Sequence, residues 1–91
     1  MEQNELEKLR TEIDAIDLVL AQKFEERMNI VTKVAEYKQK NSIATYDPKR
    51  EEKMLSKNAS YIKDRKLKKY YIELLKKLQE VSKAYQEELK Y

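Results

Sequence analysis

The chain of 91 residues has no glycine, cysteine, histidine or tryptophan, and it has a single proline. The absence of cysteine and histidine excludes a disulfide framework and a thiolate zinc site, and it argues against metal catalysis. Without glycine, and with one proline, the sequence offers helix-forming residues and very little turn or strand chemistry. We therefore expect an all-α protein.

Charged residues make up 41% of the chain, but the two signs nearly balance, with 20 Lys and Arg against 17 Asp and Glu. The net charge of +3 is spread along the sequence and gives little support for nucleic-acid binding. No apolar run approaches the roughly 20 residues that cross a membrane, and the acidic start at residues 1–5 is unlike a signal peptide. We expect a cytoplasmic protein whose partners include neither a membrane nor a nucleic acid.

Turn-forming residues divide the chain into three helical segments. Asp47 followed by Pro48 is typical of a helix start, because aspartate caps the first turn and proline fits its first position. Asp64 offers a second capping side chain. With no internal repeat and no low-complexity linker, we expect one domain over residues 1–91. The predicted helices cover residues 4–40, 48–62 and 67–89.

The first predicted helix carries an apolar stripe that includes two cations. At about 100° per residue, Arg27 and Lys38 fall about 20° apart, inside the sector that the apolar residues occupy. Cations facing a core without partners would each cost several kcal/mol. These two residues therefore predict a site for an anion. The apolar residues of the stripe span roughly 80° and are Leu6, Leu9, Ile13, Ile16, Leu20, Phe24, Val31 and Val34.

The length of this helix bears on assembly. About 37 residues give a helix of ~55 Å, whereas a compact chain of this size has a radius of gyration of about 12 Å. Much of the stripe would face water in a monomer, so we expect an intertwined homodimer. Arg10 and Arg27 lie ~25 Å apart along the axis, too far for one small ligand. An antiparallel partner chain could supply its own Arg10.

Further polar residues occur where they could join such a site. Ser82 and Gln86 lie one turn apart at the edge of the apolar face of the third predicted helix. Asp47, Arg50 and Glu51 share the first turn of the second helix, where backbone donors favour an anion. The apolar face of the third helix consists of Leu67, Tyr71, Leu74, Leu78, Val81, Tyr85 and Leu89.

The joint spacing of several short motifs is more specific than any one of them. They are Leu9-Arg10-Thr11-Glu12-Ile13-Asp14-Ala15-Ile16-Asp17, Glu26-Arg27, Val34-Ala35-Glu36-Tyr37-Lys38, Asp47-Pro48-Lys49-Arg50-Glu51, Ser82 and Gln86. Taken together, this series resembles the all-helical class of chorismate mutases. The resemblance covers nearly the whole chain.

The resemblance implies three-helix chains that entwine into a homodimer, with two equivalent sites that each take an N-terminal arginine from the partner. It implies the rearrangement of chorismate to prephenate in the biosynthesis of phenylalanine and tyrosine, a pericyclic step without cofactor, metal or nucleophile. Such an enzyme binds a flexible dianion in its reactive conformer and stabilises negative charge on the ether oxygen. Association with another enzyme of the shikimate pathway stays open.

The resemblance also assigns roles to individual residues. Arg10 of the partner chain and Arg27 would clamp the two carboxylates of chorismate. Lys38, also near a carboxylate, and Gln86 would donate to the ether oxygen, and Glu51 would accept from the substrate hydroxyl. Three further binding residues complete the set: Ser82, which would contact a carboxylate, and Asp47 and Arg50, which would shape the rim.

Three other interpretations compete with this one. An isochorismate-pyruvate lyase would share the fold and the cationic clamps, but the family pattern of that enzyme lacks a counterpart of Glu51. A helical interaction module would use Arg27 and Lys38 to set the pairing of chains, and Arg10 would then be a solvated charge. A basic nucleic-acid binder would keep its cations outside the apolar stripe.

Overall fold

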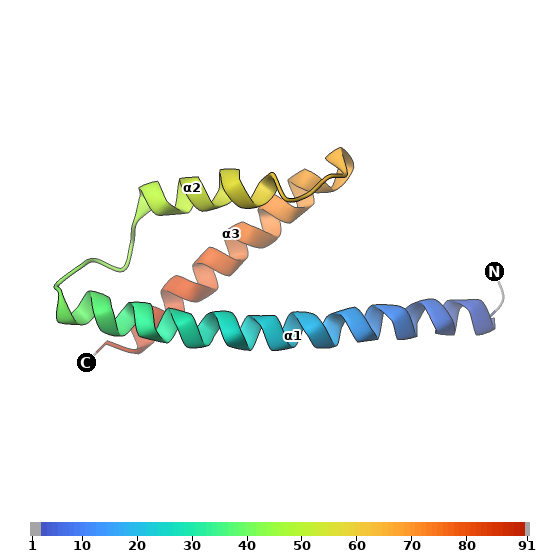
Figure 1. Ribbon diagram of the computed structural model, residues 1–91, viewed down its shortest axis with the longest axis horizontal. Coiled ribbons are helices and arrows are strands. Elements are labelled where there is room, and N and C mark those ends of the chain that lie inside the picture. Colours follow the sequence, from blue (N-terminus) through green and yellow to red (C-terminus); the bar gives the residue numbers. More distant parts are fainter. Residues whose placement is uncertain (1–2, 91) are drawn as a thin grey trace. The chain divides into compact units, whose positions relative to one another are not determined.

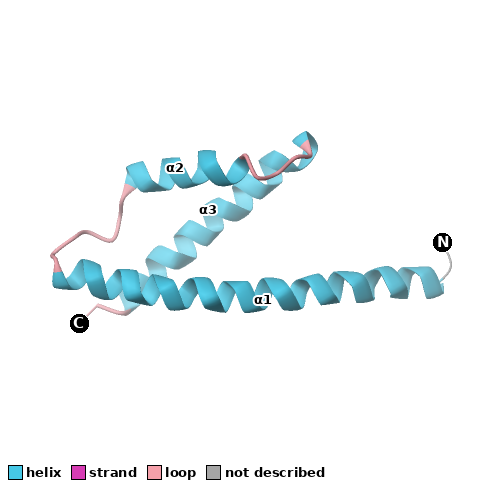
Figure 2. Ribbon diagram, in the orientation of Figure 1, coloured by secondary structure: helices cyan, strands magenta, loops and turns pink. Residues whose placement is uncertain are grey.

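The computed structural model describes residues 3–90, and their regular structure is all-helical, as the sequence predicts. The helices are α1 (Gln3–Lys40), α2 (Pro48–Ala59) and α3 (Arg65–Glu88), in the order shown in Figure 1. Figure 2 shows the two loops that join them. None of these helices carries an apolar stretch long enough to cross a bilayer. The chain divides into two compact units between residues 30 and 31.

Capping residues place both later helices. The Asp47 carboxylate accepts from the backbone N–H of Arg50 at 3.1 Å, and Pro48 occupies the first turn of α2, as predicted. The Asp64 carboxylate accepts from the backbone N–H of Lys66 at 3.0 Å. This cap starts α3 at Arg65, two residues before the predicted start.

The predicted end of the second helix at residue 62 is wrong by three residues, because α2 ends at Ala59. The backbone amides of Ser60, Tyr61 and Ile62 each donate to the carbonyl three residues earlier. Such bonds form tight turns in place of α-helical geometry. The third helix ends at Glu88, one residue before the predicted end.

The end of α1 has the hydrogen-bond pattern of a Schellman cap. The backbone amide of Ile43 donates to the Lys38 carbonyl at 2.8 Å, and that of Ser42 donates to the Gln39 carbonyl at 3.4 Å. Ser42 has a φ of 54°, in the left-handed region that glycine usually occupies. Because this sequence has no glycine, a serine makes the reversal that leads into the loop at 43–47.

In the second unit α2 packs against α3. The buried line along α3 consists of Leu75, Ser82 and Gln86, which are 2%, 7% and 8% exposed. This line is rotated from the predicted apolar face, since Leu67 and Leu74 are 52% and 60% exposed. Ser82 and Gln86 therefore belong to the buried face of α3, where the sequence placed them only at its edge.

In the first unit the apolar stripe of α1 lies open in the single chain. Six of its residues are between 37% and 60% exposed: Leu6, Leu9, Ile13, Ile16, Leu20 and Phe24. This exposure agrees with the expectation that much of the stripe faces water in a monomer. The intertwined homodimer itself stays a prediction.

Candidate functional site

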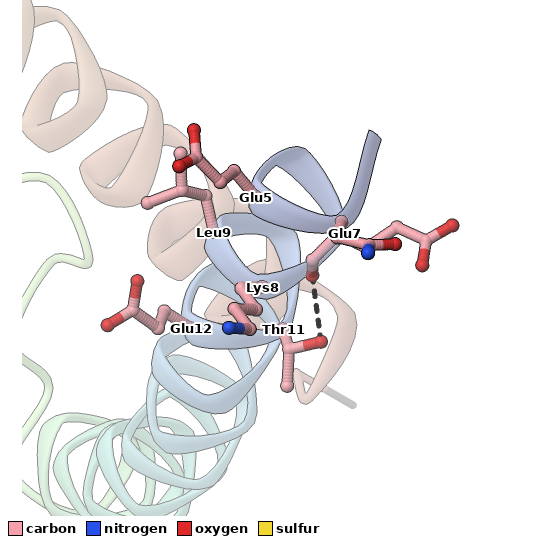
Figure 3. A pocket seen from close by; sticks show the side chains of 7 residues that line it. Glu5, Glu7, Lys8, Leu9, Thr11 and Glu12 are labelled. Atoms are coloured by element: carbon pink, nitrogen blue, oxygen red, sulfur yellow. Dashed lines mark hydrogen bonds between the residues drawn. The ribbon is translucent and has the colours of Figure 1, made fainter. Parts of the chain in front are cut away.

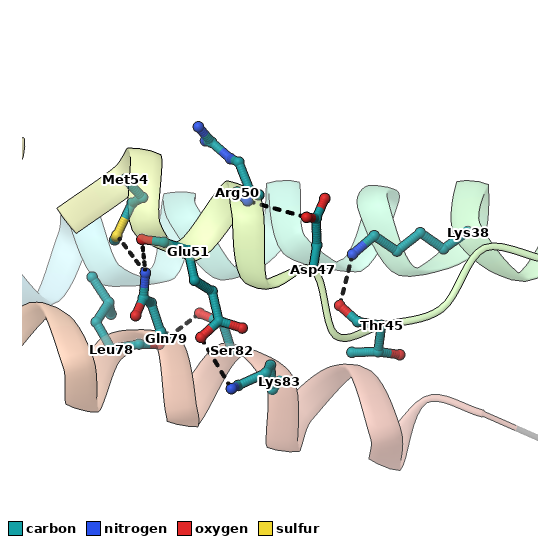
Figure 4. A network of polar contacts seen from close by, with 10 residues as sticks. All are labelled: Lys38, Thr45, Asp47, Arg50, Glu51, Met54, Leu78, Gln79, Ser82 and Lys83. Atoms are coloured by element: carbon teal, nitrogen blue, oxygen red, sulfur yellow. Dashed lines mark hydrogen bonds and ion pairs between the residues drawn. The ribbon is translucent and has the colours of Figure 1, made fainter. Parts of the chain in front are cut away.

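Polar side chains of the second unit gather between the end of α1, the loop that follows it, and α2 and α3 (Figure 4). Lys38, in the last turn of α1, is half-buried, and its Nζ donates to the carbonyl oxygen of Thr45 at 3.0 Å. Thr45 is itself buried, at 9% exposed. An ammonium has three N–H groups, so a contact with one carbonyl still leaves it able to bind an anion.

Glu51 is half-buried in the first turn of α2 and is fastened to α3 (Figure 4). Its Oε1 lies 3.1 Å from Nζ of Lys83, and its backbone carbonyl accepts from Nε2 of Gln79 at 2.9 Å. The same Gln79 nitrogen donates to Sδ of Met54 at 3.1 Å. These contacts hold the predicted hydroxyl acceptor at a fixed place between the two helices.

Sequence reasoning missed Gln79, Lys83 and Thr45. A signal for the first two was available, because Gln79 and Lys83 share a helical face with Ser82 and Gln86 at spacings of three and four residues. No comparable signal exists for Thr45, because its backbone carbonyl, common to every residue, makes the contact with Lys38.

Gln86 and Ser82 bring polar atoms to the buried face of α3. The Ser82 hydroxyl donates to the Leu78 carbonyl at 2.8 Å, a common way to satisfy a serine inside a helix. Oε1 of Gln86 is buried and has no hydrogen-bond partner within residues 3–90. Since buried polar atoms are nearly always paired, Gln86 is a place where a group from outside the chain would complete the bonding.

Asp47 and Arg50 are both exposed at the start of α2. The Asp47 carboxylate serves the helix cap, and the Arg50 side chain extends away from α3 in Figure 4. Their predicted place at the rim of a binding site stays a prediction.

Arg10 and Arg27 belong to the first unit. Arg10 is exposed, whereas Arg27 is half-buried. The roles that the sequence predicts for these two guanidinium groups, one in each protomer of a dimer, likewise stay predictions.

The end of α3 contacts the end of α1 and the loop that follows it, in which the Thr45 carbonyl binds Lys38. The pKa of Glu87 lies below its ordinary value. The main cause is the Lys90 ammonium, which donates to Oε1 of Glu87 at 2.9 Å, and the second cause is a hydrogen bond from the Thr45 side chain. Nε2 of Gln39 donates to the Leu89 carbonyl at 3.2 Å. Because the pKa is lowered on folding, the stabilisation from Glu87 is present above the ordinary pKa of glutamate and is lost as pH falls through the lowered value.

The surface of α1 has a hollow near the start of the helix. Its walls come from one helix alone (Figure 3), so it is a stretch of helix surface and encloses no ligand. In the described part of the chain, no cluster of acidic side chains could hold a metal ion. The residues that line the hollow are Asn4, Glu5, Glu7, Lys8, Leu9, Thr11 and Glu12.

Comparison with known proteins agrees with the all-helical fold. The sequence matches the family chorismate mutase type II over residues 9–87, and the chain belongs to that family. A relative from Streptomyces venezuelae, 4-amino-4-deoxychorismate mutase, is 31% identical over 71 residues, which cover 78% of this chain and 69% of the relative. The family and this relative support a chorismate mutase-type isomerase.

Proposed function

We propose that the chain converts chorismate to prephenate, by pericyclic rearrangement, in the biosynthesis of phenylalanine and tyrosine. One observation carries the proposal: the Gln86 side chain is buried, and its Oε1 has no hydrogen-bond partner among residues 3–90. Turning the amide by 180° exchanges Oε1 and Nε2, so the same place can present a donor. A donor that stays neutral suits a reaction in which charge grows on an ether oxygen and no proton moves.

Lys38 would supply the second donor to the ether oxygen. Its contact with the Thr45 carbonyl supports this role, because a long flexible side chain that is already positioned loses less conformational freedom when it binds substrate. An acceleration of about 10⁶ requires ~8 kcal/mol, and hydrogen bonds that involve charge contribute about 1.5 to 3 kcal/mol each. A few hydrogen bonds that strengthen in the transition state would therefore supply enough free energy for this acceleration.

The remaining residues would bind and orient the dianion. Arg27, and Arg10 of a partner chain, would each offer a planar fork of donors to a carboxylate. Glu51 would accept from the substrate hydroxyl. The rest of the proposed binding set consists of Ser82, at a carboxylate, and Asp47 and Arg50, at the rim.

The proposal includes an intertwined homodimer. The exposed stripe of α1 supports it, because side chains such as Ile16 and Leu20, 60% and 59% exposed, would lie against a second copy of the chain. The dimer would also bring the partner's arginine to a site that one chain leaves incomplete. Sedimentation of the purified chain tests this point, and a monomer at micromolar concentration would contradict it.

A second candidate substrate is 4-amino-4-deoxychorismate. The relative from Streptomyces venezuelae bears its name, and the same donors would serve its ether oxygen. In that case the product would be an amino analogue of prephenate, and the pathway would be a different one.

Incubating the purified chain with chorismate, isochorismate and 4-amino-4-deoxychorismate in separate reactions, and identifying the products, tests the function. Prephenate from chorismate is the expected result. Salicylate with pyruvate from isochorismate would instead support the lyase. Failure to convert any of the three would contradict an enzymatic role and favour a helical interaction module.

A further inference from the structure

We propose that Lys83 makes this site select a substrate with a neutral hydroxyl, and reject an ammonium, at the position facing Glu51. The inference rests on the proposed function, since it concerns the substrate group that Glu51 would contact. It makes chorismate preferred over 4-amino-4-deoxychorismate, in which an amino group replaces the 4-hydroxyl.

The Lys83 ammonium is held beside Glu51 by two partners. Its Nζ lies 3.1 Å from Oε1 of Glu51 and 4.7 Å from the centre of the Tyr46 ring, and Figure 4 shows the ion pair bridging α3 and α2. The side chains of Lys83 and Glu51 are 34% and 24% exposed. Both are better shielded than those of four ion pairs between residues three positions apart, whose side chains are all at least 45% exposed.

This ion pair changes what Glu51 can recognise. With Oε1 facing an ammonium, the charge of the carboxylate is already balanced, while Oε2 can accept a hydrogen bond from a hydroxyl. An aliphatic amine is protonated at neutral pH and would bring a second positive charge to the same carboxylate. The site as built therefore suits a neutral donor better than a charged one.

The separation between a substrate ammonium and Nζ of Lys83 determines how strongly the site would reject the amino substrate. A substrate ammonium in contact with Glu51 would lie within roughly 6 Å of Nζ of Lys83, because each nitrogen would be about 3 Å from a carboxylate oxygen. At that separation, two like charges repel by the equivalent of about a hundredfold in affinity at an effective dielectric constant of 20. Because a third of the Lys83 side chain is exposed, solvent screening reduces this, and we expect at least about tenfold.

The experiment measures kcat and KM for both substrates with the full chain and three variants. The unaltered chain should prefer chorismate by about tenfold or more in kcat/KM. Lys83→Met removes the charge at similar length and should reduce that preference by about tenfold, chiefly through a lower KM for the amino substrate. Lys83→Arg keeps the charge and should keep the preference.

Lys77→Met is the matched control. It removes a lysine of the same helix whose partner is Glu80, in an ion pair with side chains 70% and 67% exposed, and it should leave the preference unchanged. Circular dichroism confirms that each variant is folded. If Lys83→Met does not fold, the comparison uses Lys83→Gln, which should lose the preference in the same way.

The outcomes separate this inference from the proposed function. If the unaltered chain converts the amino substrate as well as chorismate, or if the uncharged variants at position 83 keep its preference, the role of Lys83 is wrong and the isomerase function stands. If the unaltered chain converts neither substrate, the proposed function fails, and the inference fails with it.

Discussion

Replacing Gln86 by glutamate tests the proposed donor to the ether oxygen. The two side chains have nearly the same shape, but a carboxyl group donates a hydrogen bond only while it is protonated, whereas the amide donates at any ordinary pH. If Gln86 supplies the donor, Gln86→Glu should be active only at acidic pH.

The magnitude follows from the burial of this position. The Gln86 side chain is 8% exposed, and burial raises the pKa of a carboxyl group above its ordinary value of about 4.3. Above the raised pKa, the protonated fraction falls about tenfold for each pH unit. Between pH 5 and pH 8, kcat/KM of the variant should therefore fall by about a hundredfold to a thousandfold, far more than that of the unaltered chain.

The assay follows chorismate disappearance over this pH range in buffers of constant ionic strength. Gln22→Glu makes the same chemical change at an exposed position of α1 and should leave the profile unaltered. A flat profile for Gln86→Glu would refute the contact with the ether oxygen. Inactivity at every pH, in a variant with unchanged helix content, would refute it as well.

Three further predictions concern stability and assembly. Leu75→Ala, at a position 2% exposed, should lower the free energy of unfolding by about 2 to 5 kcal/mol in urea denaturation, whereas Leu18→Ala, at 61% exposed, should change it by less than about 0.5 kcal/mol at the same chain concentration. Ser42→Gly should raise the free energy of unfolding by about 0.5 to 1 kcal/mol, because glycine fits a φ of 54° without steric cost, and a loss of stability would contradict the strain at this cap. If Arg10 acts in the partner's site, mixing inactive Arg10→Ala and Lys38→Ala chains should restore part of the activity through one intact site per heterodimer, and no recovery in verified heterodimers would count against a shared site.

The local capping chemistry could be predicted from the sequence because it depends on neighbours along the chain. Asp47 with Pro48 begins α2, and Asp64 caps α3, as their side-chain contacts confirm. The end of α2 could not be predicted as well, since residues 60–62 change from α-helical to tighter bonding without a proline or glycine to mark it.

The sequence also predicted that Lys38, Glu51 and Gln86 lie within α1, α2 and α3. It could not predict the partners of Lys38 and Glu51, because these come from other segments: the Thr45 carbonyl faces Lys38, and Lys83 faces Glu51. A lysine on an amphipathic helix is most often a solvated charge, and no periodicity argument distinguishes one that reaches a carboxylate 32 residues away.

The sequence by itself determined the helical class, the start of α2 and the capping residue of α3, because helix propensity, apolar periodicity and capping act over a few neighbouring residues. Only the tertiary structure decided which face of α3 is buried. Leu74 and Leu75 are equally apolar, yet they are 60% and 2% exposed, because burial depends on how α3 is rotated against α2. That rotation placed Ser82 and Gln86 on the buried face and brought Lys83 to Glu51.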